Sequence, residues 1–137
     1  MTKMVQSHWK LEVFKKAFAV ASSLTEVSRA FPKEEMYSLT SQMRRAARSV
    51  CANLAEAWRK RCYIAAFISK LSDAEGEAAE TQVWIQFAVK CNYMDRMVAD
   101  RHFRECEEVI RILVSMCMHA EDWTFPEPKR IRKPATV

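Results

Sequence analysis

An arginine-rich stretch, residues 39–61, is the first part of the sequence that could carry chemistry. It reads LTSQMRRAARSVCANLAEAWRKR, has neither glycine nor proline, and holds six cationic side chains. A helix turns by about 100° per residue, and on that wheel several arginines lie nearly opposite the apolar side chains. We name this group the arginine stripe: Arg44, Arg45, Arg48 and Arg59. A guanidinium donates two parallel hydrogen bonds to a phosphate, so the stripe predicts a polyanion-binding surface.

Further cationic side chains follow the stripe and recur near the C-terminus. Contacts of this kind position a phosphate backbone without reading bases, so we expect weak sequence specificity. The predicted nucleic-acid contacts are Arg44, Arg45, Arg48, Arg59, Lys60, Arg61, Lys129, Arg130, Arg132 and Lys133.

A line of acidic and aromatic side chains is expected on the third helical segment. Steps of four, three and four residues bring three carboxylates and an indole onto one helix face. Large aromatics anchor interfaces, and charges around them set the register, so we predict a contact between subunits. The predicted subunit-interface residues are Asp73, Glu77, Glu80, Trp84 and Phe87. A solvated charged face is one alternative. A metal or catalytic site is another, although no histidine follows a glutamate at the spacing of di-iron proteins.

The cysteines and histidines suggest little further chemistry. His102 and Cys106 are four residues apart and could offer two zinc ligands, but no second close pair completes a tetrahedral site. The five cysteines include no C-x-x-C pair, so we expect reduced and mostly buried thiols. The serines show neither a nucleophile elbow nor a glycine-rich phosphate loop. We therefore expect no enzymatic activity, no metal and no cofactor.

The elements that must position these residues are long helices. The chain has 137 residues and one glycine, too few turn-forming residues for many short strands. Thr40 is a candidate N-cap for the second helix, Asn92 a left-handed end for the third, and Asp95 an N-cap for the fourth. The predicted helices cover about residues 8–28, 41–60, 63–91 and 96–122.

Apolar side chains recur along these segments at heptad-like spacing, and the connections are short. The prediction is an all-α, antiparallel, up-and-down four-helix bundle over residues 1–122. Residues 123–137 hold three of the four prolines and form a basic tail, expected to be extended or disordered. The predicted core seams are Val13, Ala17, Leu24 and Val27, widened by Phe14, Phe18 and Ala21; Met43, Ala47, Val50, Leu54 and Ala57; and Phe67, Leu71, Ala74, Ala78, Ile85 and Ala88.

Charge is distributed unevenly along the chain. Residues 1–70 carry a net charge of +8, residues 71–122 carry −6 and residues 123–137 carry +3, which gives the formal +5 of the whole. A basic front half can neutralise an acidic back half within or between subunits, and the excess permits a polyanion partner. The stretch MTKMVQSHWK lacks the apolar segment of a signal peptide, and no apolar run approaches the ~20 residues that span a bilayer. We expect a cytoplasmic protein without a membrane partner.

Four segments of the sequence resemble those of the S23 family. They are LTSQMRRAARSVCANLAEA, FPKEEMYSLTSQ, KLSDAEGEAAETQVW and NYM. This family of four helix bundle proteins includes reading frames within intervening sequences of some bacterial 23S rRNA genes. The likeness covers roughly residues 8–120. Cys51 replaces a frequent proline and Ala57 a frequent glycine, so a milder kink of the second helix is expected here.

The resemblance implies a bundle that assembles as a homopentameric ring with a central passage. A structural relative, the accessory variability determinant of diversity-generating retroelements, is also a pentamer and binds a reverse transcriptase and nucleic acid. We therefore expect a ring-forming, non-enzymatic adaptor for structured nucleic acid, RNA favoured, or for a nucleic-acid-handling protein such as a reverse transcriptase. The alternative is a structural ring with an unknown client, in which Arg44, Arg45 and Arg48 pair with Asp73, Glu77 and Glu80 of a neighbouring subunit.

Overall fold

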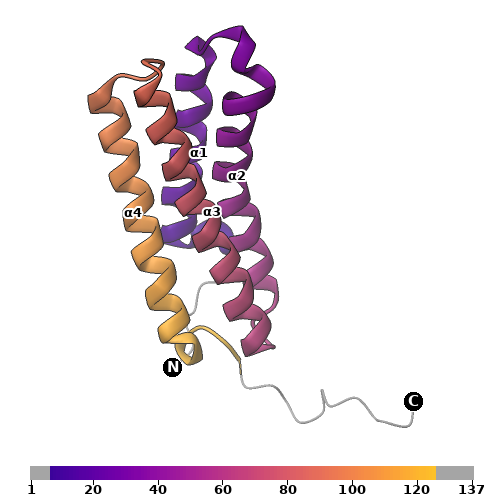
Figure 1. Ribbon diagram of the computed structural model, residues 1–137. Coiled ribbons are helices and arrows are strands. Elements are labelled where there is room, and N and C mark those ends of the chain that lie inside the picture. The colour runs from indigo at the N-terminus through magenta and orange to yellow at the C-terminus, as the bar shows by residue number, and fades with distance from the viewer. Residues whose placement is uncertain (1–6, 126–137) are drawn as a thin grey trace.

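Four α-helices make up most of the structure, a computed structural model that describes residues 7–125 (Figure 1). The described part contains no β-strand and no helix that is both long and apolar enough to cross a membrane. The all-α prediction is therefore confirmed. The helices are α1 (Glu12–Val27), α2 (Ser41–Arg59), α3 (Ile64–Lys90) and α4 (Arg96–Met118).

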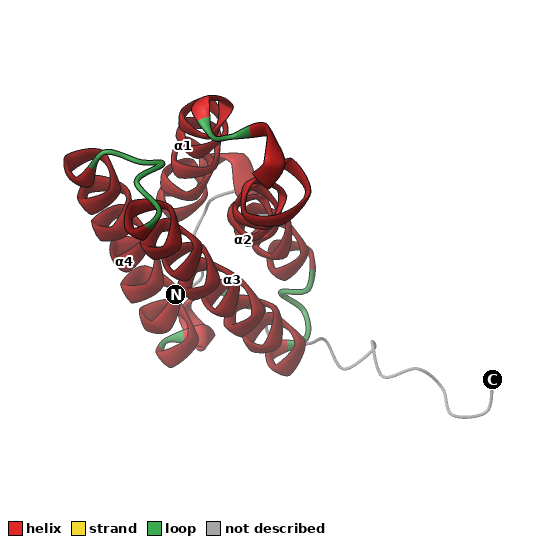
Figure 2. Ribbon diagram, turned by 45° about the horizontal axis from the view of Figure 1, so that its top comes forward, coloured by secondary structure: helices red, strands yellow, loops and turns green. Residues whose placement is uncertain are grey.

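The helices run up and down around one shared axis. Each helix packs against the next in the chain, and α4 closes the bundle by packing against α1. Viewed closer to its axis, the bundle shows α1 and α3 on opposite sides, with α2 and α4 between them (Figure 2). Short connections between long helices enforce the antiparallel arrangement. The predicted four-helix bundle is confirmed.

The first helix begins later than predicted. Residues His8–Lys10 form a short 3₁₀ helix, capped by the Ser7 side chain, and Leu11 then adopts an extended backbone with ψ 133° before α1 begins at Glu12. The Leu11 side chain is buried, so the change of direction carries it into the core. The periodic pattern of apolar residues does not reveal this break, because it continues across the extended residue.

The prediction that Thr40 caps α2 is wrong. Thr40 is itself helical, at φ −60° and ψ −50°, and its side chain makes no capping bond. A π-helical turn, Met36–Thr40, precedes α2 directly, and its cap is Glu35, which accepts a bond from the Leu39 amide at 3.3 Å. A glutamate can cap from this position because its longer side chain reaches forward to the amide four residues later.

The remaining predicted helix ends agree with the structure at the α3–α4 connection and differ at the end of α4. Asn92 has φ 62°, and the Asp95 carboxylate accepts from the amides of Met97 and Val98 at 3.0 and 3.3 Å. These two predictions are confirmed. The helix α4 ends at Met118, and a separate 3₁₀ turn, Ala120–Asp122, follows it.

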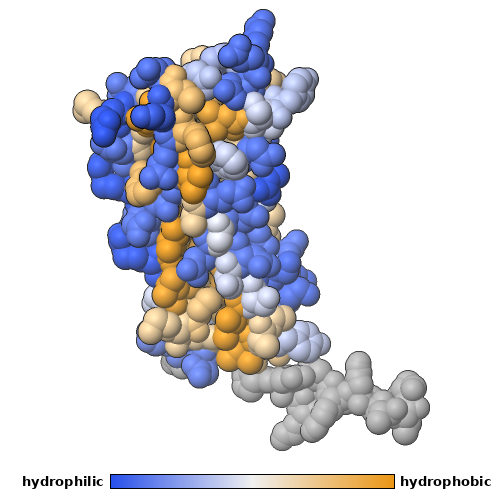
Figure 3. Space-filling model, in the orientation of Figure 1, coloured by the Kyte–Doolittle hydropathy of each residue, from blue (hydrophilic) through white to orange (hydrophobic). Residues whose placement is uncertain are grey.

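The predicted core seams of α2 and α3 are buried throughout. The seam of α1 has two exceptions, since Val27 is only half-buried and the Phe18 side chain is 52% exposed. Burial of an apolar side chain contributes about 1.5–3 kcal/mol, so these seams stabilise the bundle. Apolar side chains also reach the surface as a band over α3 and α4 (Figure 3).

The first three residues of the predicted tail belong to the packed structure. The Trp123 ring meets the Trp58 ring edge-on, with centroids 6.1 Å apart, and Thr124 is buried. The Phe125 amide donates to the Arg61 carbonyl at 3.1 Å. The packed structure thus extends to residue 125, and Trp123 helps to bury the Trp58 ring. The rest of the tail, residues 126–137, lies outside the described residues.

Candidate functional site

Two members of the arginine stripe lean toward α1. Nε of Arg44 donates to the Ser28 hydroxyl at 2.8 Å, and its Nη2 lies 3.5 Å from the Thr25 carbonyl oxygen. Nη2 of Arg48 donates to the Thr25 hydroxyl at 3.1 Å. All these acceptors are neutral. The two guanidinium groups are therefore held in place while their positive charge remains uncompensated.

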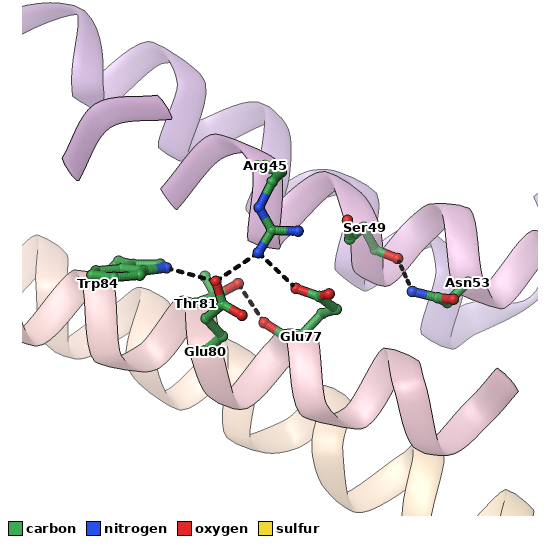
Figure 4. Close-up of polar contacts among 7 residues, drawn as sticks. All are labelled: Arg45, Ser49, Asn53, Glu77, Glu80, Thr81 and Trp84. Atoms are coloured by element: carbon green, nitrogen blue, oxygen red, sulfur yellow. Dashed lines mark hydrogen bonds and ion pairs between the residues drawn. The ribbon is translucent and has the colours of Figure 1, made fainter. Parts of the chain in front are cut away.

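A third member of the stripe leans the other way, toward α3. Nη2 of Arg45 lies 2.6 Å from Oε2 of Glu80 and 3.4 Å from Oε1 of Glu77, and the Trp84 indole donates to the same Glu80 oxygen at 3.1 Å (Figure 4). We name these four residues the Arg45 cluster. The hydrogen bond that Arg45 donates to Glu80, together with the negative charge of both carboxylates, raises the pKa of Arg45.

The Arg45 cluster corrects the alternative expectation for the stripe. That expectation paired Arg44, Arg45 and Arg48 with acidic residues of another subunit. Within the chain, Arg45 already meets Glu77 and Glu80, because α2 and α3 lie side by side. Arg44 and Arg48 contact α1 instead. Consecutive residues point about 100° apart on a helix, so adjacent arginines serve different neighbours.

A hollow of about 520 Å³ lies over the outer face of α2 and the π-helical turn before it. Three arginines of the stripe contribute to its walls. Tyr37, at its rim, is 93% exposed, a degree of exposure unusual for a tyrosine. The lining residues are Met36, Tyr37, Ser41, Arg44, Arg45, Arg48, Ser49 and Ala52.

The basic residues at the end of α2 divide into two kinds. Arg59 and Lys60 are exposed and form no ion pair with any residue of the described range 7–125. Arg61 instead packs inward, with its guanidinium carbon 3.8 Å from the Trp58 ring centroid and 4.7 Å from that of Phe125. Its Nε donates to the Trp58 carbonyl at 2.8 Å, and burial lowers its pKa.

Arg61 has a structural role, because its guanidinium packs on two aromatic rings of the same chain. Its two aromatic neighbours fix the path of the chain as it leaves the bundle, through cation–π contacts. The remaining predicted contacts, Lys129, Arg130, Arg132 and Lys133, lie outside the described residues.

The predicted interface residues fall into two groups. Glu77, Glu80 and Trp84 are half-buried within the Arg45 cluster. Asp73 and Phe87 remain exposed, with Asp73 only 3.9 Å from Lys70 and the Phe87 ring 6.0 Å from that of Trp84. The Phe87 side chain is 53% exposed. An apolar ring beside the Arg45 cluster thus remains uncovered in the single chain.

A serine, a histidine and a glutamate that sequence reasoning missed meet between α1 and α4. Nε2 of His102 lies 3.0 Å from the Ser23 hydroxyl, and its Nδ1 lies 2.7 Å from Oε1 of Glu105. The order of these groups is that of a Ser–His–acid triad. No sequence signal reveals it, because Ser23 and His102 are 79 residues apart and only the closure of the bundle joins them.

The surroundings of this trio favour a structural role. A nucleophilic serine needs amide donors aimed at the developing oxyanion. Ser23 lies within α1, where the amides bond along the helix, and His102 is 2% exposed. The trio therefore ties α1 to α4 through the bond between Ser23 and His102, while the bond between His102 and Glu105 lies within α4.

The cysteines have the character of buried apolar groups where the structure encloses them. Burial, reinforced by the charges of Glu105 and Glu107, raises the pKa of the Cys106 thiol to about 12, and burial raises that of Cys51 to about 11. Both ring nitrogens of His102 already have hydrogen-bond partners, which leaves neither facing a metal with Cys106. Within residues 7–125, no group of three or more histidine, cysteine, aspartate or glutamate side chains could hold a metal ion.

Comparison with known proteins places this bundle in a family. The family model of the 23S rRNA-intervening sequence protein matches residues 9–115. The chain belongs to the 23S rRNA-intervening sequence protein family. The match includes the arginine stripe, the Arg45 cluster and Phe87, so the features described above lie within the family domain.

One solved structure from the same family has a similar fold. It is a protein of unknown function from the S23 ribosomal protein family of Bacteroides thetaiotaomicron VPI-5482. The TM-score is 0.70 at 25% sequence identity, over 77% of this chain and 95% of the other. No curated protein matched this chain.

Proposed function

We propose that this protein is a non-enzymatic adaptor that forms a homopentameric ring and binds structured nucleic acid, RNA favoured, through its basic surface. A nucleic-acid-handling protein such as a reverse transcriptase is a second client of the same surface. In this proposal, the phosphate backbone supplies the affinity and the ring supplies several binding surfaces at once.

The observation that carries the proposal is the state of Arg44 and Arg48. Their guanidinium groups are oriented by hydroxyl and carbonyl oxygens of α1, and neither forms an ion pair within the described residues 7–125. An arginine held by neutral acceptors loses little further freedom on binding and keeps its full attraction for a phosphate. Arg59 and Lys60 extend this basic surface along α2.

Support for self-association comes from the outer face of α3. Phe87 and Val83 are 53% and 42% exposed, and a Cβ atom added to Gly76 would meet nothing within 4 Å. A neighbouring helix could approach closely at Gly76 and cover both apolar side chains. Five copies of a +5 chain would together carry about twenty-five excess positive charges, enough to attract a polyphosphate by counterion release.

A structural ring with an unknown protein client is the second candidate. The Arg45 cluster weakens the nucleic-acid candidate at one position of the arginine stripe, because that arginine is committed to two carboxylates of its own chain and is not free for a ligand. In this case Arg44 and Arg48 would serve the client protein, and RNA would compete poorly.

A salt titration separates the two candidates. Filter binding of a structured RNA hairpin should show affinity at 20–50 mM salt that falls steeply toward 200 mM, since bound phosphates release counterions. The double variant Arg44→Gln/Arg48→Gln should reduce both the affinity and its dependence on salt. Arg104→Gln/Arg111→Gln, on the far helix α4, is the matched control. Absence of RNA binding at low salt would exclude the nucleic-acid adaptor and leave the structural ring.

A further inference from the structure

A second hollow adjoins the one over α2 and extends it toward α1. It measures about 440 Å³ and lies between the two helices. Arg48 lines both hollows, so they meet at its side chain. The second hollow is lined by Phe18, Ala21, Ser22, Thr25, Glu26, Arg48 and Cys51. We name the two together the α1–α2 groove. From Tyr37 to Cys51, α2 and its preceding turn cover about 21 Å at 1.5 Å per residue.

Each end of the α1–α2 groove presents an exposed aromatic ring. Tyr37 is 93% exposed at one end, and Phe18 is 52% exposed at the other. Phe18 is supported from behind by Phe14, whose ring is inclined to it by 24° with centroids 5.9 Å apart. Tyr37 sits where the backbone departs from helical geometry, at φ −101° and ψ 15°. Both rings would gain by being covered with a flat apolar surface.

Between the two rings the groove carries uncompensated positive charge. Arg44 and Arg48 are held by neutral oxygens of α1, as described above. The acidic side chain in the groove, Glu26, lies 3.3 Å from Nε of Arg29, which offsets its charge. The walls therefore offer aromatic, cationic and again aromatic groups in sequence, with hydroxyls between them.

This order of groups matches the chemistry of an unpaired nucleotide strand. Guanidinium groups bind the phosphates, and exposed rings stack on bases whatever their identity. In a duplex the base faces are stacked on one another and are not offered to a protein surface. An acidic peptide would satisfy the arginines but would leave both rings without a flat partner.

We propose that the α1–α2 groove binds single-stranded RNA, with bases stacked on Tyr37 and Phe18 and with phosphates on Arg44 and Arg48. This inference rests on the proposed nucleic-acid function and narrows it to the unpaired segments of a structured RNA. Loops and single-stranded ends would occupy the groove, while the surrounding basic residues would hold the adjoining helices by their phosphates.

The test compares one sequence in two forms, using full-length protein. A fluorescent 12-nucleotide RNA is titrated as a single strand and as a duplex with its complement. Tyr37→Ala should weaken single-strand binding by roughly five- to a hundredfold, the range for loss of one stacked base, and leave duplex binding nearly unchanged. Tyr37→Trp should retain single-strand binding. Tyr63→Ala removes another exposed tyrosine, at the start of α3, and is the matched control.

The outcomes separate this inference from the broader function. If Tyr37→Ala leaves single-strand binding unchanged while Arg44→Gln/Arg48→Gln abolishes it, the stacking groove is overturned and the nucleic-acid adaptor stands. Equal losses for single strand and duplex also overturn it. If no RNA binds at low salt, the broader function fails. Binding of polyglutamate with the same dependence on Tyr37, and not of single-stranded RNA, would make the groove a protein site. Tyr37 has hardly any contact area to lose, so Tyr37→Ala should fold.

Discussion

At the scale of single residues, the bundle uses polar side chains mainly to join helices. His102 is almost fully buried and bonds both Ser23 of α1 and Glu105 of its own helix. A buried polar group without a partner is expensive, so each such bond fixes how α1 lies against α4. Arg44 links α2 to the C-terminal end of α1 in the same way, through Ser28, the residue that directly follows that helix. Because this acceptor is neutral, the positive charge of Arg44 remains uncompensated.

The link through Ser23 predicts a stability difference between two neighbouring serines. Ser23→Ala leaves Nε2 of His102 without its partner and should lower the free energy of unfolding by about 1–3 kcal/mol. Ser22→Ala, one residue away on the exposed side of α1, should change it by less than about 0.5 kcal/mol. Urea unfolding followed by circular dichroism measures both. Equal values for the two variants would contradict the structural role of the trio.

The burial of the thiols predicts an order of labelling. At pH 8 the pKa values of about 11 for Cys51 and about 12 for Cys106 leave almost no thiolate on either residue. The exposed Cys91 should therefore react with iodoacetamide much earlier than these two. Peptide mass spectrometry after timed labelling gives the order, and labelling in urea, where all five cysteines should react alike, is the control. Early modification of Cys106 would show that the core opens there.

At the scale of helices, the two sides of α2 contact different helices through different kinds of bond. One side meets α3 through the Arg45 cluster, and the other meets α1 through hydroxyl groups. The turn before α2 is also bonded to the connection between α3 and α4. The Glu35 carboxylate accepts from the Tyr93 hydroxyl of that connection at 2.8 Å and from the Ser38 hydroxyl of its own turn at 2.6 Å. One acidic side chain thus joins two loops at the same end of the bundle.

The Arg45 cluster predicts a modest coupling between α2 and α3. Arg45 is half-exposed, so solvent screens the pair and the coupling should be about 0.3–1 kcal/mol. A double-mutant cycle with Arg45→Ala and Glu80→Ala measures it by urea unfolding. The exposed pair of Glu12 and Lys15 is the matched control and should show almost none. A coupling of zero for Arg45 and Glu80 would contradict the arrangement in Figure 4.

The role of Glu35 predicts a dependence of stability on pH. Bonds from Ser38 and then Tyr93 lower the pKa of Glu35 below its ordinary 4.5. A carboxylate with a lowered pKa stabilises the fold above the ordinary value, and this contribution is lost as the pH falls through the lowered pKa. The native protein should therefore be more stable than Glu35→Gln at pH 7, and the difference should shrink below pH 4.5.

The measurement for Glu35 is the urea midpoint of both proteins between pH 7 and pH 3. Glu34→Gln, at the exposed neighbouring position, controls for the general loss of a negative charge. A difference that grows as the pH falls would contradict the assignment, since it would mean that the neutral form of Glu35 is the one favoured by the fold.

At the scale of the whole molecule, two uncovered surfaces stand out among residues 7–125. One is the basic and aromatic α1–α2 groove, and the other is the apolar outer face of α3 around Phe87. They lie on different helices. A closed ring joins two different patches of each subunit, so the proposed ring would leave the groove free for RNA only if α3 contacts a patch of its neighbour other than the groove. In that case each subunit would add one weak site to the avidity of the particle.

This division predicts that assembly can be broken without loss of the fold. Phe87→Asp places a charge in the proposed subunit contact and should reduce the particle to a smaller species, ultimately a monomer. Met97→Asp, at a side chain 80% exposed on α4, should leave the mass unchanged. Light scattering coupled to size exclusion gives the mass, and circular dichroism checks that both variants remain helical. An unchanged mass for Phe87→Asp would exclude this face from the contact.

Helix positions and core seams were predictable from sequence because they follow local rules. Apolar spacing of three and four residues predicted the buried seams of α2 and α3. The residue types of Asn92 and Asp95 predicted the connection between α3 and α4, where the structure shows a left-handed residue and an N-cap. Thr40 was misassigned because the helical backbone already begins before it, in the turn Met36–Thr40, which Glu35 caps at the Leu39 amide. The break in the first predicted helix at Leu11 was missed, because an extended residue can bury its side chain without interrupting the apolar pattern.

The amino-acid sequence by itself determined the all-α bundle, the basic character of α2 and the family. Only the tertiary structure decided what each charge faces. Arg44 and Arg45 are neighbours in sequence, yet one meets neutral oxygens on α1 and the other two carboxylates on α3. Periodicity fixes the direction of a side chain relative to its own helix. Its partner depends on how separate helices pack, and that is set by contacts between residues far apart in the chain.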